Sequence, residues 1–214
     1  RQGLLRRSHG GALPVEPLLY EPFRHDSSFQ EQEQECAAEK RRIGLRAAEL
    51  VADGEIISIC AGTTTTQVAR ALRHRKNLTI FTNTVNVAME LSHRDDLTVH
   101  VTGGFLSGDW FALVGPAAVE SAGAMFVDKI FVGADGVHAE HGLTTNYPDQ
   151  AAIHRAMLGQ AARKIVVADH RKIGATGTAL ISSINTLDVL ITDEGATDRA
   201  VAPFIKRGLT VIRV

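Results

Sequence analysis

The strongest constraint on the fold is an alternation, along nearly the whole chain, of short apolar runs with segments of helical periodicity. Between the runs, apolar residues recur at helical spacing, as Ile43, Ala47 and Leu50 do. Strands that are buried on both faces and joined by helices form a mostly parallel sheet. The sequence therefore predicts an α/β fold whose sheet is covered by helices. The strand-length apolar runs lie at residues 55–60, 78–83, 97–102, 129–136, 164–169, 187–193 and 209–214.

The length of 214 residues, 44% of them hydrophobic, suffices for one sizeable domain. Glycines and prolines are frequent in residues 1–21, which we expect to form a connector with one edge strand, leaving 22–214 as the folded domain. The chain begins with Arg1 and carries a basic start, so we expect a piece of a longer protein. No apolar run is long enough for a membrane span or a signal core, which predicts a cytoplasmic protein.

The formal net charge of −1 argues against a chain that binds nucleic acid by itself. Cys36 and Cys60 lack metal-ligand spacing, so we expect two reduced, buried thiols. His138, Glu140 and His141 lie one to three residues apart without a further partner, which favours a surface loop over a metal site. We predict no metal and no cofactor.

The stretch from Ile56 to Leu72 reads as a buried strand, a hydroxyl-rich turn and the start of a helix. Gly62 permits a sharp turn, and the residues Thr63, Thr64 and Thr65 follow it. Threonine hydroxyls and the free N–H groups of the helix start would favour a phosphate or carboxylate. The alternative is that Thr64 or Thr65 only caps the helix.

Further small or polar residues follow the other predicted strands, where ligands bind in parallel sheets. They are Asn83, Gly104, Asp135 and Lys172. Together with the Gly62 turn they suit a small phosphorylated polyol, since amide and carboxylate groups bind hydroxyls and glycines let the backbone approach. Asp135 also has two other interpretations, a turn cap and, less favoured, a general base.

With these residues, the chain resembles the C-terminal effector-sensing domain of the DeoR family of bacterial transcription regulators. Each shared motif alone is weak evidence for this family, but the order and spacing of the motifs together are specific for it. The similarity runs from Arg7 to Val214 and includes residues 7–12, 39–40, 62–64, 82–83, 103–104, 115–116, 128–136, 142–144, 155–157, 168–172 and 191–193.

The resemblance implies a fold like ribose-5-phosphate isomerase, used for sensing. It also implies a regulator, favoured as a repressor, whose N-terminal winged helix-turn-helix binds operator DNA, with residues 1–21 as its tail and linker. Homo-oligomers are typical of the family. The effector-binding residues that we predict are Lys40, Gly62, Thr63, Thr64, Thr65, Asn83, Gly104, Asp135 and Lys172, with no catalytic residue.

Some predictions have alternatives. Lys40 lies beside Arg41 and Arg42, so a solvated charged helix face is as well supported as a phosphate contact. Trp110 and Phe111 fit an oligomer or lid surface and ordinary packing equally. The chain also departs from the residues usual in the family, which bears on the effector more than on the fold. These departures are at Cys60, Ala61, Ala152, His154 and Arg171.

Two other functions compete with the sensor. One is a sugar-phosphate isomerase of the same fold. The sequence argues against this function, because it lacks the glycine-rich lysine loop that those enzymes share. The other is an oligomerisation domain with a vestigial pocket.

Overall fold

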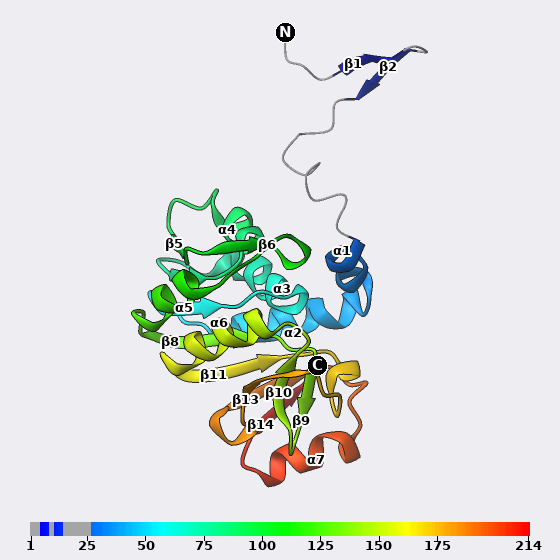
Figure 1. The fold of residues 1–214 in the computed structure, drawn as a ribbon. Helices are drawn as coiled ribbons and strands as arrows, with labels where there is room; N and C mark the ends of the chain where they lie inside the picture. The colour runs from blue at the N-terminus through cyan, green and yellow to red at the C-terminus, as the bar shows by residue number, and fades with distance from the viewer. Residues whose placement is uncertain (1–4, 9–10, 15–26) are drawn as a thin grey trace.

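The computed structural model describes residues 5–8, 11–14 and 27–214, and its centre is a sheet of seven strands (Figure 1). Every neighbouring pair in this sheet is parallel, so the predicted fold class is confirmed. Each of the seven apolar runs supplies one strand. The strands are β3 (Ile56–Ile59), β4 (Thr79–Thr82), β5 (Thr98–Val101), β8 (Val127–Val132), β11 (Ala161–Val167), β13 (Val189–Thr192) and β14 (Thr210–Arg213).

Helices cover both faces of the sheet (Figure 1). Successive side chains of a strand point to opposite faces, and β8 shows this, since Phe131 joins one core while Ile130 and Val132 join the other. The helices on the Phe131 side are α2 (Ala37–Glu49), α3 (Thr63–Ala71) and α4 (Val85–Leu91); those on the opposite side are α5 (Pro116–Gly123), α6 (Pro148–Gly159) and α7 (Asp198–Lys206).

The order of the strands reverses in the middle of the sheet. The spatial order is β14-β13-β11-β8-β3-β4-β5, so the chain runs outward from β3 to one edge and then returns to β8 and runs to the other. Loops that follow β3 and β8 therefore diverge to opposite faces and leave a crevice at the carboxyl ends of these two strands. The fold thus places a binding crevice beside Gly62 and Asp135.

Two smaller antiparallel sheets were not predicted. One is the hairpin of β6 (Phe105–Ser107) and β7 (Ala112–Val114); the other has the order β12-β10-β9, formed by β12 (Ala179–Ser182), β10 (Gly142–Thr145) and β9 (Gly136–His138). Gly136 is needed here because a Cβ would lie 2.5 Å from the Ala175 carbonyl oxygen.

The remaining elements are short. β1 (Leu5–Ser8) pairs antiparallel with β2 (Gly11–Pro14), where a connector with one edge strand was expected; the rest of residues 1–21 lies outside the described residues. Helix α1 (Ser27–Gln34) precedes α2, and single helical turns lie at η2 (Leu72–His74), η3 (Gly108–Trp110), η4 (His170–Lys172) and η5 (Ile184–Thr186). None of the helices in the described ranges is long and apolar enough to span a membrane.

Helix α3 begins at Thr63, directly after Gly62, which ends the loop. Helix α6 stops at Gly159, and Ala161 already pairs in β11. One prediction about the cysteines was wrong. Cys60 is buried as expected, but Cys36 is only partly buried, at the start of α2.

Candidate functional site

A pocket lies at the carboxyl ends of β3, β8 and β11, where the strand order reverses. The space between its walls is about 530 Å³, including the mouth that is open to solvent. The loop after each of these strands contributes to the lining, and so do α2, α6 and the β6–β7 hairpin. The lining residues are Gln32, Lys40, Ala61, Gly62, Thr63, Thr64, Trp110, Gly133, Ala134, Asp135, Thr145, Tyr147, Gln150, His154, Ala168, Asp169 and Lys172.

The start of α3 forms one wall of the pocket. Gly62 is the N-cap, with a φ of 149°, and a Cβ there would lie 3.1 Å from Thr65 Oγ1. No side chain caps the helix, and Thr64 and Thr65 both lie inside it, so the capping alternative is wrong. The hydroxyls of Thr65 and Thr66 both donate to the Gly62 carbonyl at 2.8 Å. Thr63 and Thr64 line the pocket instead. Their side chains and the N–H groups of the first turn are therefore placed to bind an anion.

Lys40 lies on α2 and forms a second wall. Its side chain is buried, with 2% of the residue exposed, so the alternative of a solvated charged face is wrong. Its ammonium group donates to the carbonyl of Gln32. Burial lowers the pKa of Lys40 below its ordinary value, and the nearby Asp169 carboxylate acts in the opposite direction. A buried ammonium group beside a cavity is stabilised by an anion that enters the cavity.

Asp169 and Lys172 reach the pocket from the loop after β11. Asp169 is buried and accepts two hydrogen bonds from the Arg171 side chain, from Nε at 2.9 Å and Nη2 at 3.3 Å. Burial acts to raise the pKa of Asp169, but the Arg171 guanidinium outweighs it and holds the pKa below the usual value. The Asp169 charge is thus paired, and Lys172 adds a second cation to the pocket beside Lys40.

Asp135 follows β8 and lines the pocket, while its Oδ2 holds the neighbouring loop. Oδ2 accepts hydrogen bonds from Thr145 Oγ1 and from the Asn146 backbone N–H, both at 2.8 Å. The turn-capping interpretation and the pocket position therefore both hold for this residue. One carboxylate oxygen remains without a hydrogen bond from the described residues.

Three of the predicted effector-binding residues do not line the pocket. Thr65 is buried and its hydroxyl is used within the helix start. Asn83 is also buried; its Oδ1 accepts from the Ala61 backbone N–H at 3.0 Å, which holds the loop after β3. At Gly104 a Cβ would lie 2.5 Å from the Val114 carbonyl oxygen, so this glycine serves the packing of the β6–β7 hairpin. The other six are brought together: Lys40, Gly62, Thr63, Thr64, Asp135 and Lys172.

None of the predicted effector-binding residues belongs to the wall formed by α6 and Trp110. Gln150 and His154 are buried, one helical turn apart, and Tyr147 lies just before the helix. Burial lowers the pKa of His154 to about 4, and the Asp135 carboxylate opposes this effect. Trp110 packs edge-on against Tyr147, with ring centroids 5.4 Å apart. The i, i+4 spacing of Gln150 and His154 was the available signal, and it resembles ordinary packing.

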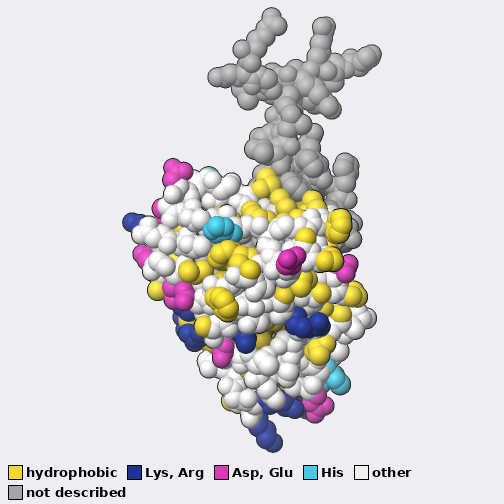
Figure 2. Space-filling model, turned by 60° about the vertical axis from the view of Figure 1, so that its left-hand side comes forward, with side chains coloured by type: hydrophobic (Ala, Val, Ile, Leu, Met, Phe, Trp, Pro, Cys, Tyr) yellow, Lys and Arg dark blue, Asp and Glu magenta, His cyan; other side chains and the backbone are white. Residues whose placement is uncertain are grey.

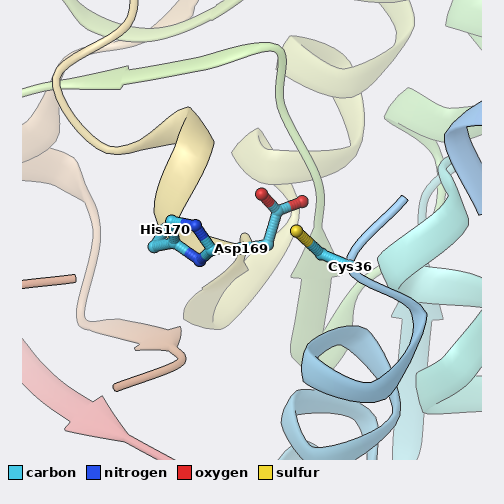
Figure 3. Close-up of side chains that lie close together, drawn as sticks. All are labelled: Cys36, Asp169 and His170. Atoms are coloured by element: carbon cyan, nitrogen blue, oxygen red, sulfur yellow. The ribbon is translucent and has the colours of Figure 1, made fainter. Parts of the chain in front are cut away.

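Cys36, Asp169 and His170 bring potential metal-ligand atoms within 4.8 Å of one another, and Figure 3 shows the Cys36 side chain beside the Asp169 carboxylate. Asp169 is already paired with Arg171, and His170 Nδ1 lies 2.8 Å from Asp193 Oδ2. The guanidinium supplies the positive charge that this carboxylate requires and would repel a metal ion. We therefore assign no metal to this group.

Comparison with known proteins gives matches over most of the chain. The family described as the DeoR C terminal sensor domain matches residues 35–194. The HTH-type transcriptional regulator GlpR of Haloferax volcanii is 33% identical over 192 residues, which is 90% of this chain and 73% of that protein. The putative aga operon transcriptional repressor of Escherichia coli O157:H7 is 31% identical over 216 residues, covering 100% of this chain and 78% of that protein. Similar solved structures include ribose 5 phosphate isomerase A from Neisseria gonorrhoeae, with a TM-score of 0.43, 18% identity, and coverage of 62% of this chain and 52% of that one.

Proposed function

This chain belongs to the DeoR family through its C-terminal sensor domain, and from that premise we propose that it is the effector-binding and oligomerisation domain of a transcriptional repressor. Its effector is a phosphorylated sugar or a related metabolite. The observation that carries this proposal is the buried Lys40 ammonium, which faces the same pocket as the start of α3. A cation and a helix N-terminus together favour a phosphate group.

The relatives favour a regulator over an isomerase. They bear the names of transcriptional regulators and repressors, and one is named for the aga operon. In the pocket, Oδ2 of Asp135 holds the loop at Thr145 and Asn146, a role that sensing accommodates.

Operator DNA is part of the proposal. We assign residues 1–21 to the linker and tail of an N-terminal winged helix-turn-helix domain, as the names of the HTH-type relatives suggest. The charge of −1 on this chain gives it little affinity for DNA of its own, so contact with the operator belongs to that other domain. A cytoplasmic location follows from the DNA target.

Helix α1 is the proposed route by which effector binding reaches the DNA-binding domain. Its Gln32 carbonyl accepts from Lys40, and Phe29 packs edge-on against Trp110 with ring centroids 6.3 Å apart. Glu35, which follows the helix, accepts from Arg171 at 2.5 Å. A phosphate bound to Lys40 competes with the Gln32 carbonyl, so the effector changes the position or the order of α1, which follows the linker in the sequence.

A second copy of the chain is the proposed partner in the assembly. Phe105 and Leu106 on β6 are 74% and 54% exposed, and Val101 on the neighbouring edge strand β5 is 43% exposed. The side of the molecule that carries β5 and α5 in Figure 1 comes forward in Figure 2, where hydrophobic side chains gather on the surface. Apolar surface of this kind is typical of interfaces between subunits.

The proposal is tested by titration of the chain with sugar phosphates and their unphosphorylated parents. Trp110 is the only tryptophan and lines the pocket, so its fluorescence reports binding directly. An effector at about 100 times its dissociation constant should also add roughly 2.7 kcal/mol to the free energy of unfolding, a shift of a few degrees in Tm.

The variant Thr64→Val tests whether binding takes place in the pocket, because it removes a pocket hydroxyl at nearly constant side-chain volume. We expect weaker binding of the phosphorylated compound, and no change in Thr210→Val, whose side chain is exposed on β14. Consumption of the compound would identify an enzyme instead. If no phosphorylated compound binds, the pocket is vestigial and the proposal is wrong.

A further inference from the structure

On helix α6, two side chains that line the pocket have buried polar atoms with no hydrogen-bond partner within the described part of the chain. These are Gln150, whose Nε2 is unpaired, and His154, both of whose ring nitrogens are unpaired. They are 7% and 2% exposed, respectively. A buried polar group without a partner is costly, and three such atoms on one helix face, all in residues that line the pocket, indicate that a ligand supplies the partners.

The charge of this wall differs from that of the opposite side. Lys40 and Lys172 lie near one another and near the start of α3. On the α6 side, the charged group that acts on His154 is the Asp135 carboxylate. Because burial holds His154 neutral at pH 7, its ring offers one N–H donor and one acceptor, and Gln150 adds an amide. The pocket therefore has a cationic end and, on the α6 side, an end beside the Asp135 carboxylate that is rich in hydrogen-bonding groups.

We propose that Gln150, His154 and Asp135 form a second subsite, which binds the neutral hydroxyl groups of the effector remote from its phosphate and excludes phosphorylated sugar acids. This inference rests on the proposed function and narrows its ligand class. Hydroxyl groups donate and accept, as this set of side chains requires. A carboxylate at the same place would lie beside Asp135 without a cation to pair with it, and like charges in contact weaken binding strongly.

The test compares two pairs of ligands that differ only at the end remote from the phosphate. The pairs are glucitol 6-phosphate with gluconate 6-phosphate, and erythritol 4-phosphate with erythronate 4-phosphate, each titrated against Trp110 fluorescence. In the pair whose carbon chain fits the pocket, the polyol phosphate should bind at least about 30-fold more tightly than the sugar-acid phosphate. Equal affinities, or a preference for the acid, would overturn the subsite while leaving phosphate sensing intact. If none of the four compounds binds and inorganic phosphate does not bind either, the proposed function is wrong as well.

Variants at the subsite give a second, independent measurement. Gln150→Met and His154→Leu remove the unpaired polar groups at similar volume, so the unliganded fold should be as stable as before or more stable. We expect binding of the preferred polyol phosphate to weaken about tenfold, with inorganic phosphate affected less than about twofold. Thr192→Val is the matched control, because Thr192 also has a buried, unpartnered hydroxyl but lies outside the pocket. The inference is wrong if both variants bind the polyol phosphate as the wild type does.

Discussion

Replacing Lys40 by methionine should weaken effector binding without lowering the stability of the fold. The substitution keeps most of the apolar stem and removes the ammonium group, which donates only to the Gln32 carbonyl among the described residues. A hydrogen bond to a charged group is worth about 1.5–3 kcal/mol. Since 1.4 kcal/mol corresponds to a factor of about ten, Lys40→Met should weaken binding of a sugar phosphate roughly 10- to 150-fold.

The same substitution should not destabilise the unliganded protein. The Lys40 residue is only 2% exposed, and the nearby Asp169 is already paired with Arg171. Loss of one hydrogen bond is therefore offset by the removal of a buried charge. We expect the free energy of unfolding at pH 7 to stay constant or to rise by about 1 kcal/mol.

The pH dependence follows from the lowered pKa of Lys40. The ordinary pKa of lysine, 10.5, applies to the unfolded chain, and the folded value lies below it. Between the two values the unfolded chain binds more protons, so stability rises with pH in that window and is lowest at pH values below it. Lys40→Met should lack this rise, which urea unfolding at several pH values measures.

Trp110 fluorescence and urea unfolding together can refute this reasoning. Lys206→Met is the control, because Lys206 is exposed at the end of α7 and should change neither quantity. Wild-type affinity for sugar phosphates in Lys40→Met would show that Lys40 does not bind the effector. A loss of more than about 3 kcal/mol of stability would show that its role is structural.

Three further results are expected. The pKa of His154 is lowered by burial to about 4 from 6.5, so the stability due to its neutral form is complete above pH 6.5 and falls by up to about 3 kcal/mol as the pH drops to 4; His154→Leu should flatten this loss in acid unfolding curves. A maleimide reagent should modify Cys36 and spare Cys60 in the native protein, because Cys60 is fully buried; mass spectrometry of the labelled peptides decides this, and equal labelling would contradict it. Asn83→Leu should lower stability by about 1–3 kcal/mol because it leaves the Ala61 N–H unpaired; a change in phosphate affinity without a change in Tm would instead favour a ligand role.

The sequence predicted the main sheet because its strands are buried on both faces. A strand such as β8 must carry apolar residues toward both cores, and this produces a continuous run that can be recognised without a structure. The short strands β6, β9 and β12 lack this property. They pair in small sheets with partly exposed faces, so their residues carry little pattern.

The candidate site was predicted in part. Residues at the carboxyl ends of the strands, such as Thr64 and Asp135, follow from the position of each strand, and six of the nine predicted residues line one pocket. Asn83 and Gly104 also follow strands, but the structure uses them to hold loops. Position at a strand end thus places a residue near the rim, whereas the direction of its side chain depends on the loop.

The sequence by itself determined the fold class, the succession of strands in the main sheet, and the presence of anion-binding groups after β3, because these depend on local periodicity and on residue type. Only the tertiary structure decided that the strand order reverses between β3 and β8, which brings Lys40 from α2 and His154 from α6 to the same pocket. Residues 114 positions apart meet there through packing on opposite faces of one sheet, and no local pattern records such a contact.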